Sequence, residues 1–254
     1  MLRYLVFAAA LQQIVVPFLV NPFGGGGRTG AVAQGSVSSG IEPAGYAFVI
    51  WTAIYGGALA YAAWQLTAAG RAEPVTTRIA IPLVILYFGS SAWLYFAKYG
   101  PLWATVPTLA VMAAMAIVVL VVVSSARPAI DSWTRWALLI LPIALYAGWT
   151  SCAVFVNFAE VAPGYGFARL GLSREGFAVA ALLGATGLAI GVLWATSGQP
   201  AYAATVVWAL AAIVVAVVLR GEPGSIAVTS ALGIIAVTVA SWWLRKGASA
   251  PQLT

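Results

Sequence analysis

One stretch of the chain, residues 141–157 (LPIALYAGWTSCAVFVN), combines lipid-compatible residues with two aromatic rings and an amide. Each residue of an α-helix turns by about 100°, so Tyr146, Trp149 and Asn157 fall within about 80° of one another. Ala153 lies between them on the same face. Trp149 is deep in an apolar run, not at a membrane interface, where Trp is ordinary. This face carries two rings, a small residue between them and the amide, and an amide that needs a hydrogen-bond partner. The combination predicts a ligand pocket.

Two earlier stretches repeat the combination of an aromatic ring with a polar group. Trp51 and Tyr55 are four residues apart and share a helix face, and Ser90 and Trp93 are three apart. Such faces suit a flat, apolar molecule with a few polar edges, although packing or interfacial rings give the same pattern. The predicted ligand-binding residues are Trp51, Tyr55, Ser90, Trp93, Tyr146, Trp149, Ala153 and Asn157.

The composition indicates a membrane protein, in which lipid surrounds most of the chain. The 254 residues are 63% hydrophobic and 7% charged, whereas a soluble domain has about 25% charged residues. Only helices or a closed barrel satisfy their backbone groups in a bilayer. The apolar runs are near-continuous and about 20 residues long, which indicates helices, since barrel strands alternate over about 10 residues.

The predicted fold is therefore all-α, a polytopic transmembrane bundle of about eight helices. The expected spans are 4–20, 45–66, 78–100, 101–123, 136–159, 177–196, 201–219 and 225–244. Gln12 and Gln13 lie inside the first span, where amides usually face other helices, and a ligand role is the alternative. The connection 21–44 is long enough to be a lid over the bundle, and a plain linker is equally compatible with it.

Several kinds of chemistry are excluded by missing residues. The chain has no His and one Cys, Cys152, so His bases, imidazole metal sites and internal disulfides are absent. Both lysines, Lys98 and Lys246, lie at helix ends, which rules out a retinal Schiff base in mid-membrane. No acid pair lies inside a span, as a proton relay would need. We expect no enzyme activity, no catalytic residue, no metal and no resident cofactor.

The charges predict how the chain lies in the membrane. An even number of helices places both termini on one side, and seven of the 12 Lys and Arg residues fall there. Those seven are Arg3, Arg71, Arg78, Arg127, Arg135, Arg245 and Lys246. By the positive-inside rule we predict cytoplasmic termini, in a bacterial inner membrane. The net charge of +6 has no basic cluster, so nucleic-acid binding is not expected.

Taken together, these residues resemble the tryptophan-rich sensory protein family, also called the translocator protein or peripheral benzodiazepine receptor family. The second helix of that family has W-T-x-x-Y after a Pro, as here in Trp51, Thr52 and Tyr55 after Pro43. Its fifth helix has P-Y-x-x-W with Ala four and Asn eight residues later, and 146–157 match that spacing except that Leu145 replaces the Pro. Its third helix has N-x-x-W, where this chain has Ser90 and Trp93.

The resemblance covers about residues 1–159, the first five helices. It implies a five-helix bundle with a pocket under the first loop that takes porphyrins and other tetrapyrroles, sterols or benzodiazepine-like drugs. We therefore predict a five-helix unit over 1–159 and three additional transmembrane helices over 160–254. The additional helices cover a face that shorter family members use for dimerisation, so a homodimer stays open. Reported family roles also include tetrapyrrole breakdown.

The function that we predict is binding of a porphyrin-like or sterol-like ligand in a Trp-lined intramembrane pocket, for sensing, regulation or transport. Its partners are then the lipid bilayer and the hydrophobic ligand, with a bound tetrapyrrole as the one cofactor-like group. Two alternatives use the same residues differently. In a transporter or channel the aromatic rings line a path, and in a structural subunit of a membrane complex they only pack.

Overall fold

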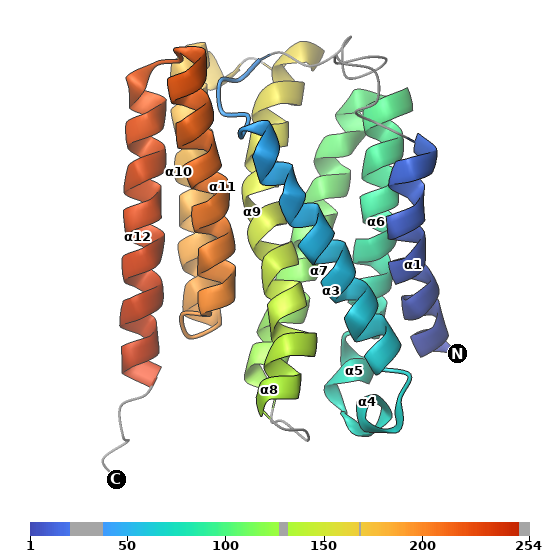
Figure 1. The fold of residues 1–254 in the computed structure, drawn as a ribbon. Coiled ribbons are helices and arrows are strands. Elements are labelled where there is room, and N and C mark those ends of the chain that lie inside the picture. Colours follow the sequence, from blue (N-terminus) through green and yellow to red (C-terminus); the bar gives the residue numbers. More distant parts are fainter. Residues whose placement is uncertain (21–37, 127–131, 168, 249–254) are drawn as a thin grey trace.

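The computed structural model describes residues 1–20, 38–126, 132–167 and 169–248. Within those residues eight helical segments are long and apolar enough to cross a membrane, as the sequence predicts. The long helices are α1 (Leu2–Val20), α3 (Ile50–Trp64), α6 (Ala80–Tyr99), α7 (Thr105–Ser125), α9 (Leu141–Val161), α10 (Arg174–Ala195), α11 (Pro200–Arg220) and α12 (Gly224–Ala248). The protein is an integral membrane protein built as a helical bundle (Figure 1).

Short helical turns link or extend these spans. They are η1 (Gly45–Val49), α4 (Ala68–Ala72), α5 (Val75–Arg78), η2 (Leu102–Ala104), α8 (Ser132–Arg135), η3 (Trp136–Ile140), η4 (Ala162–Tyr165) and η5 (Arg169–Gly171). The second predicted span starts as the 3₁₀ turn η1 before α3. The fifth starts with the π-helical turn η3 before α9, and the short helix α8 precedes it. The predicted loop 67–77 instead holds α4 and most of α5, and Thr67 caps α4 by accepting from the Gly70 N–H.

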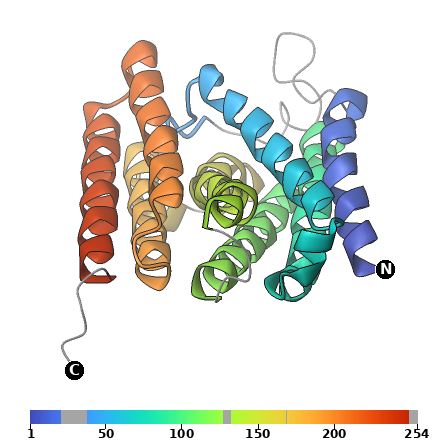
Figure 2. The same ribbon diagram turned by 60° about the horizontal axis from the view of Figure 1, so that its bottom comes forward.

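The helix with the predicted pocket face is the centre of the bundle. Figure 2 shows α9 surrounded by other helices, with α10, α11 and α12 on one side and α1 and α6 on the other. The span that contains α9 is 61% buried, against 22% for α1. Because α9 touches helices from both parts of the chain, its buried faces must suit two different sets of neighbours.

The two ends of the bundle differ in what they carry. The start of α1 and the end of α12 lie at the same end, which we call the termini end (Figure 1). The opposite end, the loop end, carries residues 38–44 and the turns before α7, α10 and α12. Residues 21–37 of the predicted lid are outside the described residues. The even number of candidate spans among the described residues agrees with the prediction that both termini lie on one side.

The last three helices pack directly against the fifth span. Gly148 of α9 faces α11, where a Cβ atom added to it would lie 2.6 Å from Cβ of Thr205. The Tyr202 hydroxyl of α11 donates to Oγ of Ser151 at 3.0 Å. Cys152 is buried beside them, as expected of a packing residue. The division of the chain at residue 159 stays a prediction.

Candidate ligand-binding site

Helices α3 and α9 bring the predicted aromatic residues together. The Trp51 ring centroid lies 5.1 Å from that of Tyr55, 5.7 Å from that of Tyr146 and 6.4 Å from that of Trp149. The last two contacts are edge-to-face, the arrangement that the ring quadrupoles favour. Trp51 thus connects the face of α3 to the face of α9. We call Trp51, Tyr55, Tyr146 and Trp149 the aromatic cluster.

Two further rings contact the cluster. Phe48 of η1 packs edge-on against Trp149 with centroids 5.5 Å apart. Tyr87 of α6 lies against Tyr146 at 6.1 Å. The sequence prediction did not include either residue. The available signals were weak: Phe48 precedes Trp51 by three residues, and Tyr87 precedes Ser90 by three.

The hydroxyl groups of the cluster are paired with side chains from other helices. The Tyr146 hydroxyl donates to Oε1 of Gln13 at 3.1 Å, across from α9 to α1. The Tyr55 hydroxyl and Oγ of Ser90 are 2.8 Å apart and share a hydrogen bond. Tyr146 and Ser90 are only 1% and 2% exposed, so these hydrogen bonds replace contacts with water that cannot reach the hydroxyl groups.

Two buried donors near the predicted residues have no hydrogen-bond partner among the described residues. They are Nε2 of Gln13 and Nε1 of Trp93. Leaving such a donor unpaired costs about 1–3 kcal/mol. An acceptor on a bound molecule would remove that cost. Gln13 therefore joins the candidate site because it couples an unpaired donor to Tyr146.

Asn157 has a protein partner. Oγ1 of Thr105, at the start of α7, lies 3.1 Å from Oδ1 of Asn157 and 2.7 Å from the Leu102 carbonyl oxygen. A hydroxyl has one proton to donate, so the Thr105 hydroxyl satisfies one of these acceptors at a time. Asn157 is 8% exposed. The amide therefore links α9 to the start of α7 near the loop end.

The remaining predicted residues lie at the border of the cluster. Ala153 is half-buried on α9, between Trp149 and Asn157 in the helical order, and packs against the core. Trp93 is half-buried on α6. None of the ring contacts recorded among the described residues joins Trp93 to the aromatic cluster.

A family model described as TSPO-like protein matches residues 3–243. The chain belongs to the TSPO-like family. This confirms the resemblance inferred from the residue pattern. The match continues beyond residue 159 through most of α12, so it includes all eight spans. No curated protein and no solved structure matches the chain.

In this TSPO-like protein Ser90 occupies the position where the family pattern has an asparagine. Ser90 is 2% exposed, and its hydroxyl reaches the Tyr55 hydroxyl directly. The shorter side chain therefore still pairs α6 with α3.

In this TSPO-like protein the rings of the aromatic cluster contact one another and leave no open space for a large ligand between the contacting rings. Trp51 contacts three other rings, Phe48 contacts Trp149, and Tyr87 contacts Tyr146. A cleft with a cavity volume of about 10 Å³ lies on the termini side of Tyr87. It is lined by residues of α3, α6, α7 and α9 together with Ile79, Leu138 and Leu139. A large flat molecule can enter the cluster only if the rings separate.

Proposed function

We propose that this TSPO-like protein binds a flat hydrophobic molecule of the porphyrin or sterol class between α3, α6 and α9. The observation that carries the proposal is the convergence of Trp51, Tyr146 and Trp149 on one buried cluster. Aromatic faces bind flat apolar ligands by offset or edge contacts. The unpaired donors of Gln13 and Trp93 suit acceptor groups at the edges of such a ligand.

Binding is common to sensing, regulation and transport, and the proposal assigns no catalytic step. Porphyrin is the preferred class because its carboxylates offer acceptors to the buried donors and its ring system offers a flat apolar face. A sterol would use the rings and place one hydroxyl near Gln13. Separate titrations with a porphyrin and a sterol show which class binds more tightly, and competition shows whether the two share the site.

The test is a titration of the full-length protein in lipid nanodiscs with protoporphyrin. We expect saturable quenching of the intrinsic Trp fluorescence, corrected for absorption by the porphyrin, with about one ligand per chain. A sterol that shares the site should displace the porphyrin. Quenching that rises without saturation, equal to that of empty nanodiscs mixed with free Trp, would refute the proposal.

We also propose that both termini face the cytoplasm of a bacterial inner membrane. Seven of the 12 Lys and Arg residues belong to the termini end by the predicted topology, and cytoplasmic loops carry the excess of these residues. Fusions of a cytoplasm-active fluorescent protein after Thr196 and at Thr254 should fluoresce, and a fusion at Gly221 should not. A periplasmic signal at Thr254 would reverse the assigned orientation.

A further inference from the structure

The two ends of the bundle carry different net charges. At the loop end, the described residues include four bases and four acids: Lys98, Arg169, Arg174, Arg220, Glu42, Glu160, Glu175 and Glu222. At the termini end, they include six bases and one acid: Arg3, Arg71, Arg78, Arg135, Arg245, Lys246 and Glu73. The described part of the termini end therefore has a formal net charge of +5, whereas the charges at the loop end balance.

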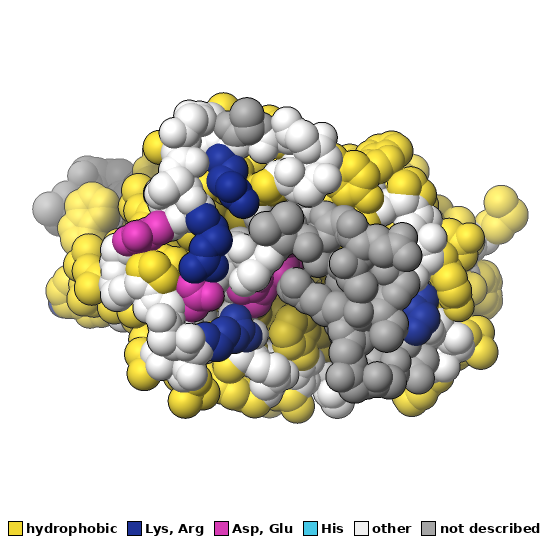
Figure 3. Space-filling view, turned by 90° about the horizontal axis from the view of Figure 1, so that it is seen from above, with side chains coloured by type: hydrophobic (Ala, Val, Ile, Leu, Met, Phe, Trp, Pro, Cys, Tyr) yellow, Lys and Arg dark blue, Asp and Glu magenta, His cyan; other side chains and the backbone are white. Residues whose placement is uncertain are grey.

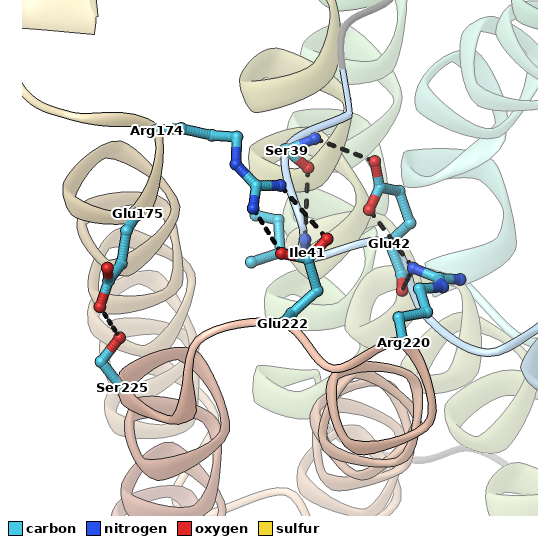
Figure 4. A network of polar contacts seen from close by, with 8 residues as sticks. All are labelled: Ser39, Ile41, Glu42, Arg174, Glu175, Arg220, Glu222 and Ser225. Carbon is cyan, nitrogen blue, oxygen red and sulfur yellow. Dashed lines mark hydrogen bonds and ion pairs between the residues drawn. The ribbon is translucent and has the colours of Figure 1, made fainter.

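At the loop end the charged side chains neutralise one another in pairs. Figure 3 shows basic and acidic side chains gathered in one patch there. Arg174 donates twice to Glu222, at 3.2 Å and 2.5 Å, and Nη1 of Arg220 lies 3.4 Å from Oε2 of Glu42 (Figure 4). Because each of these arginines has a carboxylate partner within the protein, this end has little attraction for an anion from outside.

At the termini end the fold brings three arginines together from distant parts of the sequence. Nη2 of Arg3, at the start of α1, donates to the Arg71 carbonyl oxygen at 3.1 Å and to Oγ1 of Thr76 at 3.2 Å. Arg71 lies in α4, and Arg78 ends α5 two residues after Thr76. Figure 1 shows both short helices at the same end of the bundle as the start of α1. We call Arg3, Arg71 and Arg78 the arginine patch.

The side chains of the arginine patch have only uncharged partners within the described part of the chain. Arg3 donates to a carbonyl oxygen and a hydroxyl group, and Arg71 donates to the Leu66 carbonyl oxygen. Arg78 has no side-chain partner among the described residues. Arg71 and Arg78 are exposed, whereas Glu73 between them is 0% exposed. The surface of α4 and α5 therefore presents guanidinium groups while its acid is buried.

The arginine patch lies at the depth of lipid headgroups. Tyr4, next to Arg3, is 68% exposed, and Ile81, three residues after Arg78, is 60% exposed. Both residues belong to membrane-spanning helices, α1 and α6, so their exposed apolar surface contacts lipid. Arginines that adjoin lipid-facing residues at the end of a span place their charged groups at the interface with water.

We propose that the arginine patch binds the headgroup of an anionic phospholipid. Guanidinium groups present planar pairs of N–H donors that match phosphate oxygens. A zwitterionic lipid has the same phosphate, but its own ammonium group offsets the charge, so the patch selects headgroups with a net negative charge. A bound headgroup would connect α1 to α4 and α5. The site is separate from the aromatic cluster and goes beyond the proposed function, because it requires no porphyrin and holds for either orientation of the chain.

Native mass spectrometry of the full-length protein in detergent measures the lipid affinity directly. We expect phosphatidylglycerol to bind the parent about tenfold or more tightly than phosphatidylcholine with the same acyl chains. Arg78→Gln should weaken phosphatidylglycerol binding by about fivefold, and the double variant Arg71→Gln/Arg78→Gln by about 25-fold, since each arginine near a lipid surface contributes about a factor of five. Phosphatidylcholine binding should change by less than about twofold.

Two further variants separate the charge from the fold. Arg169→Gln removes the same charge at the loop end, from a half-buried side chain, and should leave both lipid affinities as in the parent. Arg78→Lys keeps the charge and should retain most of the preference for phosphatidylglycerol. Melting temperatures check that every variant is folded, and Arg78→Gln should melt as the parent does because its side chain is exposed.

Three results would overturn the inference. The first is equal binding of the two lipids by the parent. The second is a preference for phosphatidylglycerol that survives unchanged in Arg71→Gln/Arg78→Gln. The third is displacement of phosphatidylglycerol by glycerol phosphate at an equal concentration, which would show a site for free anions instead of a lipid.

Discussion

Replacing Trp149 with alanine is expected to weaken protoporphyrin binding by about ten- to a thousandfold. Trp149 is 4% exposed and is held between Phe48 and Trp51, so its ring has a fixed orientation for stacking. A buried aromatic contact contributes about 0.5–1.5 kcal/mol beyond its area, and the lost apolar area adds about 1–3 kcal/mol. At about 1.4 kcal/mol for each factor of ten, the sum gives the stated range.

Trp149→Phe should lose much less affinity, since an aromatic face remains. The matched control is Trp194→Ala on α10, because that residue is 76% exposed on the outside of the bundle and is not part of the cluster. Each affinity is measured by porphyrin absorbance titration in nanodiscs, with the melting temperature as the check on folding. If Trp149→Ala folds and binds as tightly as the parent, the cluster is packing and the ligand site lies elsewhere.

Replacing Gly148 with alanine is expected to lower the stability of the bundle by about 1–3 kcal/mol, the usual range for overpacking. In a helix, Gly→Ala alone stabilises by about 1 kcal/mol through propensity. Here the new Cβ would lie 2.6 Å from Cβ of Thr205 and 3.0 Å from the Tyr202 carbonyl oxygen. Both contacts involve parts of α11 that cannot rotate away, so α9 and α11 must move apart.

Gly187→Ala is the matched control for this close approach. Gly187 is a helical glycine on α10 with no atom within 4 Å of an added Cβ, so this change should leave the melting temperature unchanged or slightly higher. Both variants are compared by thermal melting in the same detergent. A Gly148→Ala protein as stable as Gly187→Ala would show that α9 and α11 do not pack closely.

The separation of α9 from α11 also bears on the ligand site. The Ala44 N–H and the Ala47 carbonyl oxygen are hydrogen-bonded to Ala212 and Trp208 of α11, while the cluster is built on α9. A shift between these helices would therefore alter how Phe48 packs against Trp149. We expect Gly148→Ala to increase hydrogen–deuterium exchange in residues 38–49 as well as lower stability.

The sequence by itself determined the class of protein, the number of spans and the family. Few charges and long apolar runs leave only membrane helices, and the part of the chain that the structure describes has eight helices long and apolar enough to cross a membrane. Helical spacing also placed Tyr146 and Trp149 on one face of α9, because 100° per residue fixes that relation within a helix. The pairing of Trp51 with Tyr55 has the same origin, since four residues form about one turn.

Only the tertiary structure decided which side chains from different helices meet. The Tyr146 hydroxyl donates to Gln13, and the Thr105 hydroxyl lies within hydrogen-bond distance of Asn157. The indole N–H of Trp208 in α11 donates to the Ala47 carbonyl oxygen of η1. In a soluble protein the polar face of a helix would mark its outer side. In lipid the outer face is as apolar as the buried one, so a span such as α7, with a mean hydropathy of 2.8, does not reveal which residues face the core. Contacts between spans depend on packing in three dimensions, and no periodicity in the chain specifies them.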